Sequence, residues 1–96
     1  MGVSIINMNW RNTERIVKGV ANHRRLEILD ILLKKPELSV EEIADALKIN
    51  FKTASEHIRR LAIAGLVIKR YEGNFVRHKL TSRATSILKF LRILEC

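Results

Sequence analysis

The sequence predicts a mainly α-helical domain with one small β-hairpin, arranged as a winged helix-turn-helix. Three features lead to this fold class. A short helix has a strong start signal, a second helical pattern follows after three residues, and the pattern then changes to a two-residue period. With 96 residues and 47% hydrophobic content, the chain has the size and composition of one globular domain. We therefore expect a single domain over residues 1–96.

Two helical patterns precede the motif. Residues 10–20 form the first, which Gly19 should weaken locally because glycine disfavours a helix interior. Residues 24–34 form the second, and they are apolar on most sides, so we expect this helix at the centre of the core. Pro36, the single proline, then marks a loop.

The helix-turn-helix itself has clear boundary signals. Ser39 and Glu42 form a capping box, in which each side chain bonds the backbone amide of the other residue. An apolar stripe at helical spacing follows: Val40, Ile43, Ala44 and Leu47. After the linking residues 48–50, Asn50 is a good cap for a helix over residues 51–64, and Gly65 suits its left-handed end.

The chain then changes to strand-like periodicity. Residues 66–71 and 75–80 are expected to pair as a hairpin, with Gly73 in the short turn where a positive φ is needed. Thr81 should cap a last helix over residues 82–94. This helix carries one apolar stripe that can dock on the domain: Ala84, Ile87, Leu88, Leu91 and Leu94.

The positive charge is concentrated in the second half of the chain. Residues 1–50 hold eight Lys and Arg against seven Asp and Glu, a net +1, whereas residues 51–96 hold ten against three, a net +7. Such asymmetry indicates a surface that attracts a polyanion, although a basic protein with scattered lysines would show the same total.

The helix over residues 51–64 is the element expected to enter the major groove of DNA. Ala54, Ile58 and Leu61 form its core face, with Phe51 nearby, and the polar side chains point broadly opposite. The candidate DNA-contact residues are Lys52, Thr53, Ser55, Glu56, His57, Arg59 and Arg60 on this helix, and Arg70, Asn74 and Arg77 on the hairpin. Among these, Glu56 could accept a hydrogen bond from cytosine, but it more readily limits nonspecific affinity or pairs with Lys52 or Arg60.

This order of elements resembles the ArsR-like winged-helix regulators over about residues 16–94. The resemblance is carried by Val-Ala-Asn-His-Arg-Arg-Leu-Glu-Ile-Leu at residues 20–29, Ser-Val-Glu-Glu-Ile-Ala-Asp-Ala-Leu at 39–47, Thr-Ala-Ser-Glu-His-Ile at 53–58 and Ala-Gly-Leu-Val at 64–67. MarR-like regulators share several of these pieces and are the alternative family. The resemblance implies a dimer formed by the first and last helices, which represses transcription from a palindromic operator.

The chain departs from the metal-sensing members of that family. Those members have a Cys-x-Cys in the third helix, where this chain has Ser39-Val40-Glu41, and others use Asp and His on the last helix, where residues 82–94 have neither. We therefore expect no metal or other cofactor. His23 and His78 are expected to be structural, with His78 half buried, and Cys96 is expected to be an inert terminal thiol.

The ends of the chain are expected to form a homodimer. The last helix has more apolar side chains than one docking stripe needs, and the first helix adds others. The candidate interface residues are Trp10, Ile16, Val17, Ile87, Phe90, Leu91, Ile93 and Leu94. Residues 1–9 are too apolar for a free tail, so we expect them to cover the dimer seam, with a mobile arm as the alternative.

Other classes of protein fit the sequence less well. A winged helix used for protein interaction inside a larger assembly would leave the charge incidental. An enzyme is disfavoured because no paired nucleophile and base, Gly-rich phosphate loop or metal triad is present. No apolar run approaches the roughly 18 residues of a membrane span, and a single cysteine suits a reducing cytoplasm. The sequence names neither the operator nor an effector.

Overall fold

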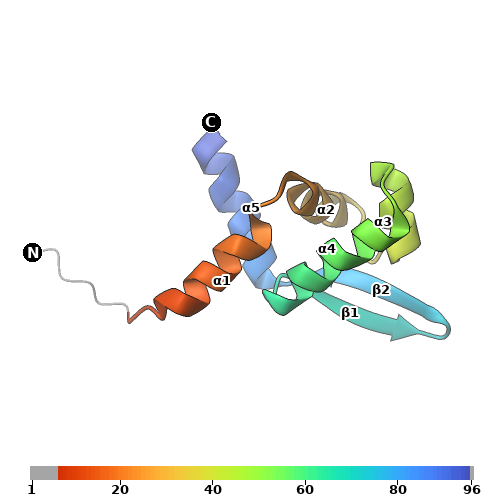
Figure 1. Cartoon of the computed structure of the whole chain (residues 1–96), viewed down its shortest axis with the longest axis horizontal. Helices are drawn as coiled ribbons and strands as arrows, with labels where there is room; N and C mark the ends of the chain where they lie inside the picture. The colour runs from red at the N-terminus through yellow and green to blue at the C-terminus, as the bar shows by residue number, and fades with distance from the viewer. Residues whose placement is uncertain (1–6, 96) are drawn as a thin grey trace, which may run out of the picture.

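The computed structural model describes residues 7–95 and has the predicted order of elements (Figure 1). Its helices and strands are α1 (Trp10–Val20), α2 (His23–Lys34), α3 (Val40–Leu47), α4 (Phe51–Ile63), β1 (Val67–Glu72), β2 (Phe75–Leu80) and α5 (Ser82–Glu95). Residues 1–6 of the expected N-terminal arm and Cys96 lie outside the described residues.

Side-chain caps fix where the helices begin. The Asn22 side chain accepts from the amides of Arg24 and Arg25, so α2 begins at His23, one residue earlier than predicted. Both bonds of the predicted capping box at Ser39 are present. Asn50 caps α4, and Thr81 Oγ1 accepts from the amide of Ala84 at 3.3 Å. These caps satisfy amides that have no partner within their own helices.

The core lies where α2, α3 and α4 meet the base of the hairpin. Ile28, Leu29 and Leu32 of α2 are almost completely buried, which confirms α2 as the central helix. The other large side chains of the core are Ile43, Ile58, Leu61, Leu66 and Val67. α4 is thus held on one face only, and its opposite face is available to a partner.

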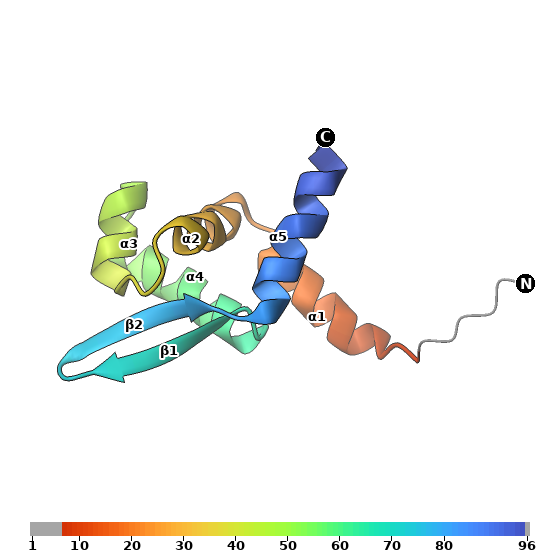
Figure 2. The ribbon, with the colours of Figure 1, turned by 180° about the vertical axis from the view of Figure 1, so that it is seen from behind.

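The hairpin is a two-stranded antiparallel sheet that extends away from α1 and α5 (Figures 1 and 2). Glu72 pairs with Phe75, so the turn is Gly73-Asn74, and Gly73 has a φ of +60° as the turn requires. The loop before α3 joins this sheet through a bridge between Leu38 and His78. The wing is therefore anchored to the helix-turn-helix at its middle as well as at its base.

Gly19 has a packing role that the sequence pattern did not indicate. A Cβ atom at Gly19 would lie 2.6 Å from the Cβ of Ala64, which caps the end of α4. α1 can therefore approach the end of α4 only because residue 19 lacks a side chain.

α1 and α5 project from the body of the domain (Figures 1 and 2). Both helices leave large apolar side chains exposed. Ala84 is buried, and Ile87 and Leu88 pack against the core, as predicted for the docking stripe of α5. Leu94, however, is 62% exposed, so the prediction that it docks on its own domain was wrong. The helix has left the domain surface before its last turn.

Two other side chains differ from their predicted environments. Phe51 is 54% exposed at the first turn of α4, so it does not belong to the core face. His78 is only 1% exposed and is fully rather than half buried. The Leu38–His78 bridge, which the local pattern does not reveal, brings the loop before α3 against β2 at His78.

The neutral form of His78 is the one that suits this site. Its Nδ1 lies 3.0 Å from the carbonyl oxygen of Leu38, which can only accept, so Nδ1 carries the proton. Its Nε2 is buried without a partner among the residues described. Burial lowers the pKa of His78 below its ordinary value near 6.5, and the nearby charge of Lys69 acts in the same direction.

The unfolding free energy should fall as the pH drops below about 6.5. The unfolded chain takes up a proton on His78 more readily than the folded chain does, so acid favours unfolding. Urea unfolding at pH 7.5 and 5.5, at one protein concentration, should show a smaller loss for His78→Phe than for the unchanged protein. Burial also lowers the pKa of His57, so the unfolding free energy of both proteins should keep some dependence on pH. Equal losses in the two proteins would show that His78 is not the cause.

Candidate nucleic-acid interface

The turn between α3 and α4 is fixed by backbone geometry. Lys48 ends α3 in the left-handed conformation, with a φ of +56°, and its amide donates to carbonyl oxygens of the last turn. The amide of Ile49 donates to the carbonyl of Ala44 at 3.0 Å. Because Asn50 immediately caps the next helix, the direction of α4 relative to α3 is set over three residues.

The core face of α4 determines which side chains point outward. Ala54, Ile58 and Leu61 are at most 2% exposed, as predicted. The exposed polar residues of the helix are Lys52, Thr53, Glu56, Arg59 and Arg60, whereas Ser55 and His57 are half buried at its edges. The structure therefore brings most of the predicted contact residues of this helix to one surface.

Glu56 lies at the centre of the charges on that surface. Its carboxylate accepts from Arg59 at 2.8 and 3.1 Å and from Arg60 at 3.0 Å. The predicted pair with Arg60 is confirmed, the partner Arg59 was not predicted, and no ion pair within the described part of the chain joins Glu56 to Lys52. These bonds, first from Arg59 and then from Arg60, lower the pKa of Glu56 to about 2. Glu56 is thus ionised near neutral pH.

His57 faces α2 rather than the outward surface. Arg25 Nε donates to its Nδ1 at 3.2 Å, so the ring acts as an acceptor. Burial, and then the charge of Arg25, lower the pKa of His57. Neutral His57 therefore positions Arg25 at the edge of α4.

The two wing arginines lie directly opposite each other in the hairpin. Arg70 pairs with Arg77 in the strand register, and Glu72 lies 3.5 Å from each. Arg70 also binds Glu37, and Arg77 lies 3.4 Å from Glu42. Carboxylates from three segments thus hold a pair of like charges together.

These carboxylates also affect the ionisation of the site. Hydrogen bonds from the backbone and side chain of Ser39 lower the pKa of Glu42, and Arg77 adds to the effect. The bond from Arg70 to Glu37 raises the pKa of Arg70. Glu37 and Glu42 were not predicted as partners of the wing, because they lie 33 and 35 residues before these arginines. The remaining predicted wing residue, Asn74, is exposed at the turn.

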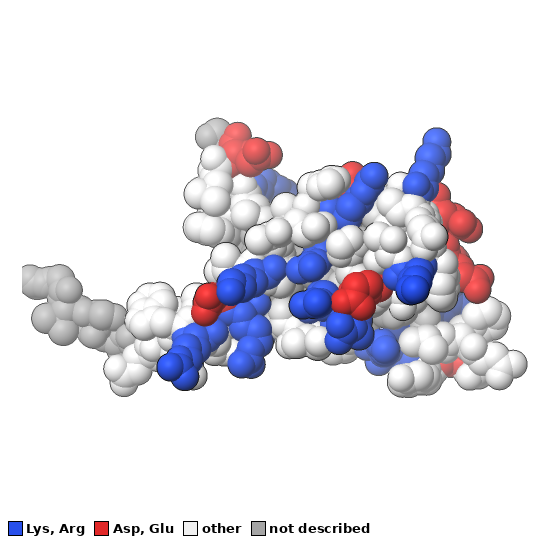
Figure 3. All heavy atoms as spheres, in the orientation of Figure 1, with Lys and Arg blue, Asp and Glu red and all other residues white. Residues whose placement is uncertain are grey.

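Lys and Arg side chains gather over α1 and α4 on one face of the molecule (Figure 3). α1 contributes Arg11, Arg15 and Lys18, none of which was among the predicted contact residues. Their spacing of four and then three residues places them along one side of a helix, and this spacing is the signal in the sequence that could have identified them.

The region from the start of α2 to β1 matches a known family. The family model for the arsR family of bacterial regulatory proteins matches residues 22–69. The chain belongs to this family. The match covers the central helix, the helix-turn-helix and the first half of β1, so it includes α4 but neither α1 nor the wing arginines.

Relatives from this family agree over longer stretches. The chain is 37% identical over 97 residues to the transcriptional activator HlyU of Vibrio cholerae, covering 100% of this chain and 89% of HlyU. It is 49% identical over 59 residues to an HTH-type transcriptional regulator of Mycobacterium tuberculosis, covering 62% of this chain but only 26% of that relative's length. The chain therefore spans about a quarter of that protein.

Solved structures show the same architecture. The homodimeric winged helix-turn-helix DNA-binding domain of an ArsR-type regulator from Mycobacterium bovis has a TM-score of 0.83 at 28% identity, covering 96% of this chain and 90% of that one. HlyU of Vibrio cholerae has a TM-score of 0.80 at 33% identity, covering 95% and 99% of the two chains. The predicted fold class and family are confirmed, and the chain is a winged helix-turn-helix transcription regulator.

Residues 7–95 contain neither a membrane-spanning helix nor a cluster of metal ligands. No helix there is long and apolar enough to cross a membrane. No group of three or more His, Cys, Asp or Glu side chains within the same residues is placed to hold a metal ion.

Replacing Glu56 by Gln should strengthen binding to unrelated duplex DNA and make the salt dependence of that binding steeper. The change removes a carboxylate from the exposed face of α4 and releases Arg59 and Arg60 for phosphates. Log affinity should gain a slope of about −0.9 against log salt for each added phosphate contact. Fluorescence anisotropy over a range of salt concentrations measures both quantities.

Asp30→Asn is the matched control, since it removes one carboxylate from an exposed pair with Lys34 on α2. It should leave both quantities unchanged. Weaker binding of Glu56→Gln to DNA, with an altered base preference, would show instead that Glu56 reads a base.

Proposed function

We propose that the protein binds a palindromic DNA operator as a homodimer and represses transcription by occupying that site. One observation carries the proposal: the exposed face of α4 presents cations and hydroxyls on a helix whose other face is locked into the core. Such a helix is the element that winged helix-turn-helix proteins insert into the major groove.

The side chains of α4 divide by the contacts they can make. Arg59 can bind a guanine edge with two hydrogen bonds, and Thr53 and Ser55 suit phosphates or either type of base. Lys52 and Arg60 supply phosphate contacts at opposite ends of the helix. Arg59 must leave Glu56 to reach a base, and this exchange is easy because exposed ion pairs contribute little to stability.

The wing can exchange its partners in the same way. Arg70 and Arg77 are bound to carboxylates in the DNA-free protein, and a phosphate can replace those carboxylates at small cost. Asn74 lies at the turn, where its side chain can donate to a phosphate. We therefore assign backbone contacts to the wing and base contacts to α4.

The projecting helices supply the dimer interface. Trp10 and Ile93 are about 70% exposed, and Val17, Phe90 and Leu94 are also exposed. Ile16, Ile87 and Leu91 are half buried beside them. Burial of one large apolar side chain contributes roughly 1.5–3 kcal/mol, so a few on each subunit can drive association.

A groove beside α5 makes the proposed dimer interface concave. It has a volume of about 510 Å³, and its apolar lining comes from Leu26, Leu33, Leu88, Leu91 and Leu94. A two-fold partner can fill it with side chains of its own α1. The dimer then presents two copies of α4 to successive major grooves.

The remaining assignments follow from this mode of action. A bacterial regulator that binds DNA works in the cytoplasm, where the DNA is. The chain has no thiolate pair in α3 and no Asp or His on the exposed turns of α5, so we propose dimerisation and DNA binding without metal. A protein-interaction module and a MarR-like regulator are the less favoured readings, since the family match supports neither.

Arg59→Ala should lower affinity for an operator by about ten- to hundred-fold per half-site and relax base preference at one position.

Arg77→Ala should weaken binding to all duplexes about equally. It should also make the slope of log affinity against log salt shallower by roughly 1 per half-site. Anisotropy with operator and unrelated duplexes measures both effects.

The control for these two variants is Lys89→Ala, which removes an exposed cation from α5, a helix that points away from α4 (Figure 1). It should bind as the unchanged protein does. Operator binding that survives Arg59→Ala at full strength and with unchanged base preference would contradict the role given to α4.

A further inference from the structure

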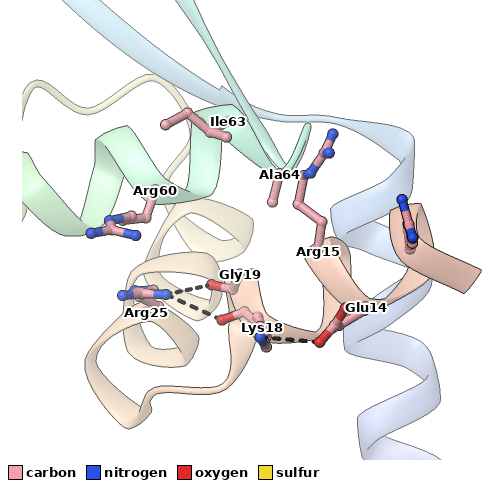
Figure 4. Close-up of a pocket in the computed structure, with 9 residues that line it drawn as sticks. Glu14, Arg15, Lys18, Gly19, Arg25, Arg60, Ile63 and Ala64 are labelled. Atoms are coloured by element: carbon pink, nitrogen blue, oxygen red, sulfur yellow. Dashed lines mark hydrogen bonds and ion pairs between the residues drawn. The ribbon is translucent and has the colours of Figure 1, made fainter.

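A cationic cleft lies between α1 and the C-terminal end of α4 (Figure 4). It has a volume of about 430 Å³ and lies beside the DNA-contact surface predicted from the sequence, with which it shares only Arg60. Its cationic lining residues are Arg11, Arg15, Lys18, Arg25 and Arg60. Ile63, Ala64 and Gly19 form an uncharged wall.

The positive charge of the cleft is poorly balanced. Glu14 is its one acidic lining residue, and it pairs with Lys18 at 3.1 Å. No ion pair within residues 7–95 engages Arg11, Arg15 or Arg25. Several cations held around one hollow repel each other, and an anion in the cleft would relieve that repulsion.

Part of the cleft is preorganised by neutral groups. Arg25 Nη1 donates to the carbonyl oxygens of Lys18 and Gly19 at 3.2 and 3.3 Å (Figure 4). Arg25 Nε donates to His57 at 3.2 Å. These acceptors fix the guanidinium without cancelling its charge. The close approach of Gly19 to Ala64 holds α1 against α4, so the two sides of the cleft keep their spacing.

The position of the cleft indicates which anion it meets. Arg60 belongs both to the cleft and to the exposed face of α4, so the two positive surfaces are continuous, as Figure 3 shows over α1 and α4. α1 also carries part of the dimer interface in the proposed function. The cleft therefore lies between the recognition helix and the two-fold axis, a region that the operator backbone must cross between its half-sites.

We propose that the α1–α4 cleft binds a backbone phosphate of the operator, on the side of α4 that faces the dimer axis. This inference rests on the proposed function, since it needs α4 in the major groove. Arg11 and Arg15 bring mobile cations to the phosphate, Arg25 supplies a fixed one, and Arg60 links the cleft to α4. The contact is independent of base sequence, so it sets affinity and register rather than specificity.

The test compares a double variant, Arg11→Gln with Arg15→Gln, with a control of equal charge change, Lys35→Gln with Lys89→Gln. Both cations of the control are exposed and lie outside the cleft. The cleft variant should make the slope of log affinity against log salt shallower by about 0.9 per subunit for one lost phosphate. Preference for operator over unrelated duplex should not change, and circular dichroism should show an intact fold.

Neutral methylphosphonate links, placed one at a time in the operator, locate the contact. A link at the bound phosphate should weaken operator binding by the unchanged protein and by the control. It should not change operator binding by the cleft variant. If no link distinguishes the cleft variant from the control, and their salt slopes agree, the cleft does not bind the operator backbone.

Two further measurements distinguish this proposal from the proposed function and from binding of a small free anion. If Arg59→Ala lowers operator binding while the cleft variant matches its control, the cleft proposal is overturned and the proposed function stands. Calorimetric titration with pyrophosphate probes the other source of a phosphate group. Pyrophosphate binding that the cleft variant loses, together with unchanged salt slopes on DNA, would make the cleft a site for small phosphorylated anions and overturn its role with the operator.

Discussion

The burial of Ala54, Ile58 and Leu61 is the constraint on which the rest of the molecule depends. These side chains occupy one face of α4 and are at most 2% exposed, so the helix cannot rotate about its axis without moving apolar side chains into water. With 100° between successive residues, this fixes Lys52, Thr53, Glu56 and Arg59 on the opposite face. The turn at Lys48 and the cap at Asn50 set the axis of the helix, and the core sets its rotation. The residues that we propose to contact DNA are therefore positioned by buried residues on the other face of the same helix.

The cations around α4 and on the wing share a second property. Glu37, Glu42, Glu56 and Glu72 hold Arg59, Arg60, Arg70 and Arg77 in defined positions in the DNA-free protein. The pairs of Arg59, Arg60 and Arg70 are exposed and those of Arg77 are half buried. For the exposed pairs, phosphates can replace the carboxylates with little loss, and salt should weaken these pairs and the proposed DNA contacts together. The cleft cations Arg11, Arg15 and Arg25 differ, because no such carboxylate pairs with them among residues 7–95. In the proposed complex, a phosphate can therefore bind these three cations without displacing a carboxylate from them.

Local signals in the sequence predicted the elements well. The Ser39–Glu42 capping box, Asn50 and Gly65 each act within a few residues, so the helix-turn-helix could be predicted to within a residue or two. Features that join distant segments could not be predicted. The Leu38–His78 bridge fully buries a histidine expected to be half buried. Two of the carboxylates that bind Arg70 and Arg77, those of Glu37 and Glu42, lie more than 30 residues away in the sequence. Phe51 and Leu94 fit their apolar stripes but lie beyond the edge of the core, which periodicity alone does not show. The cleft needed both the spacing of α1 and the contact of Gly19 with Ala64.

Selection of bound sequences from random duplexes tests the central claim most directly. Two copies of α4, fixed in rotation and related by a two-fold axis, should select an inverted repeat whose half-sites lie one helical turn apart, about 10 base pairs, or a multiple of it. Each half-site should be short, because one helix contacts only a few base edges. Enrichment of a single unrepeated site, or no enrichment over the starting pool, would contradict the account of a dimer that reads DNA through α4.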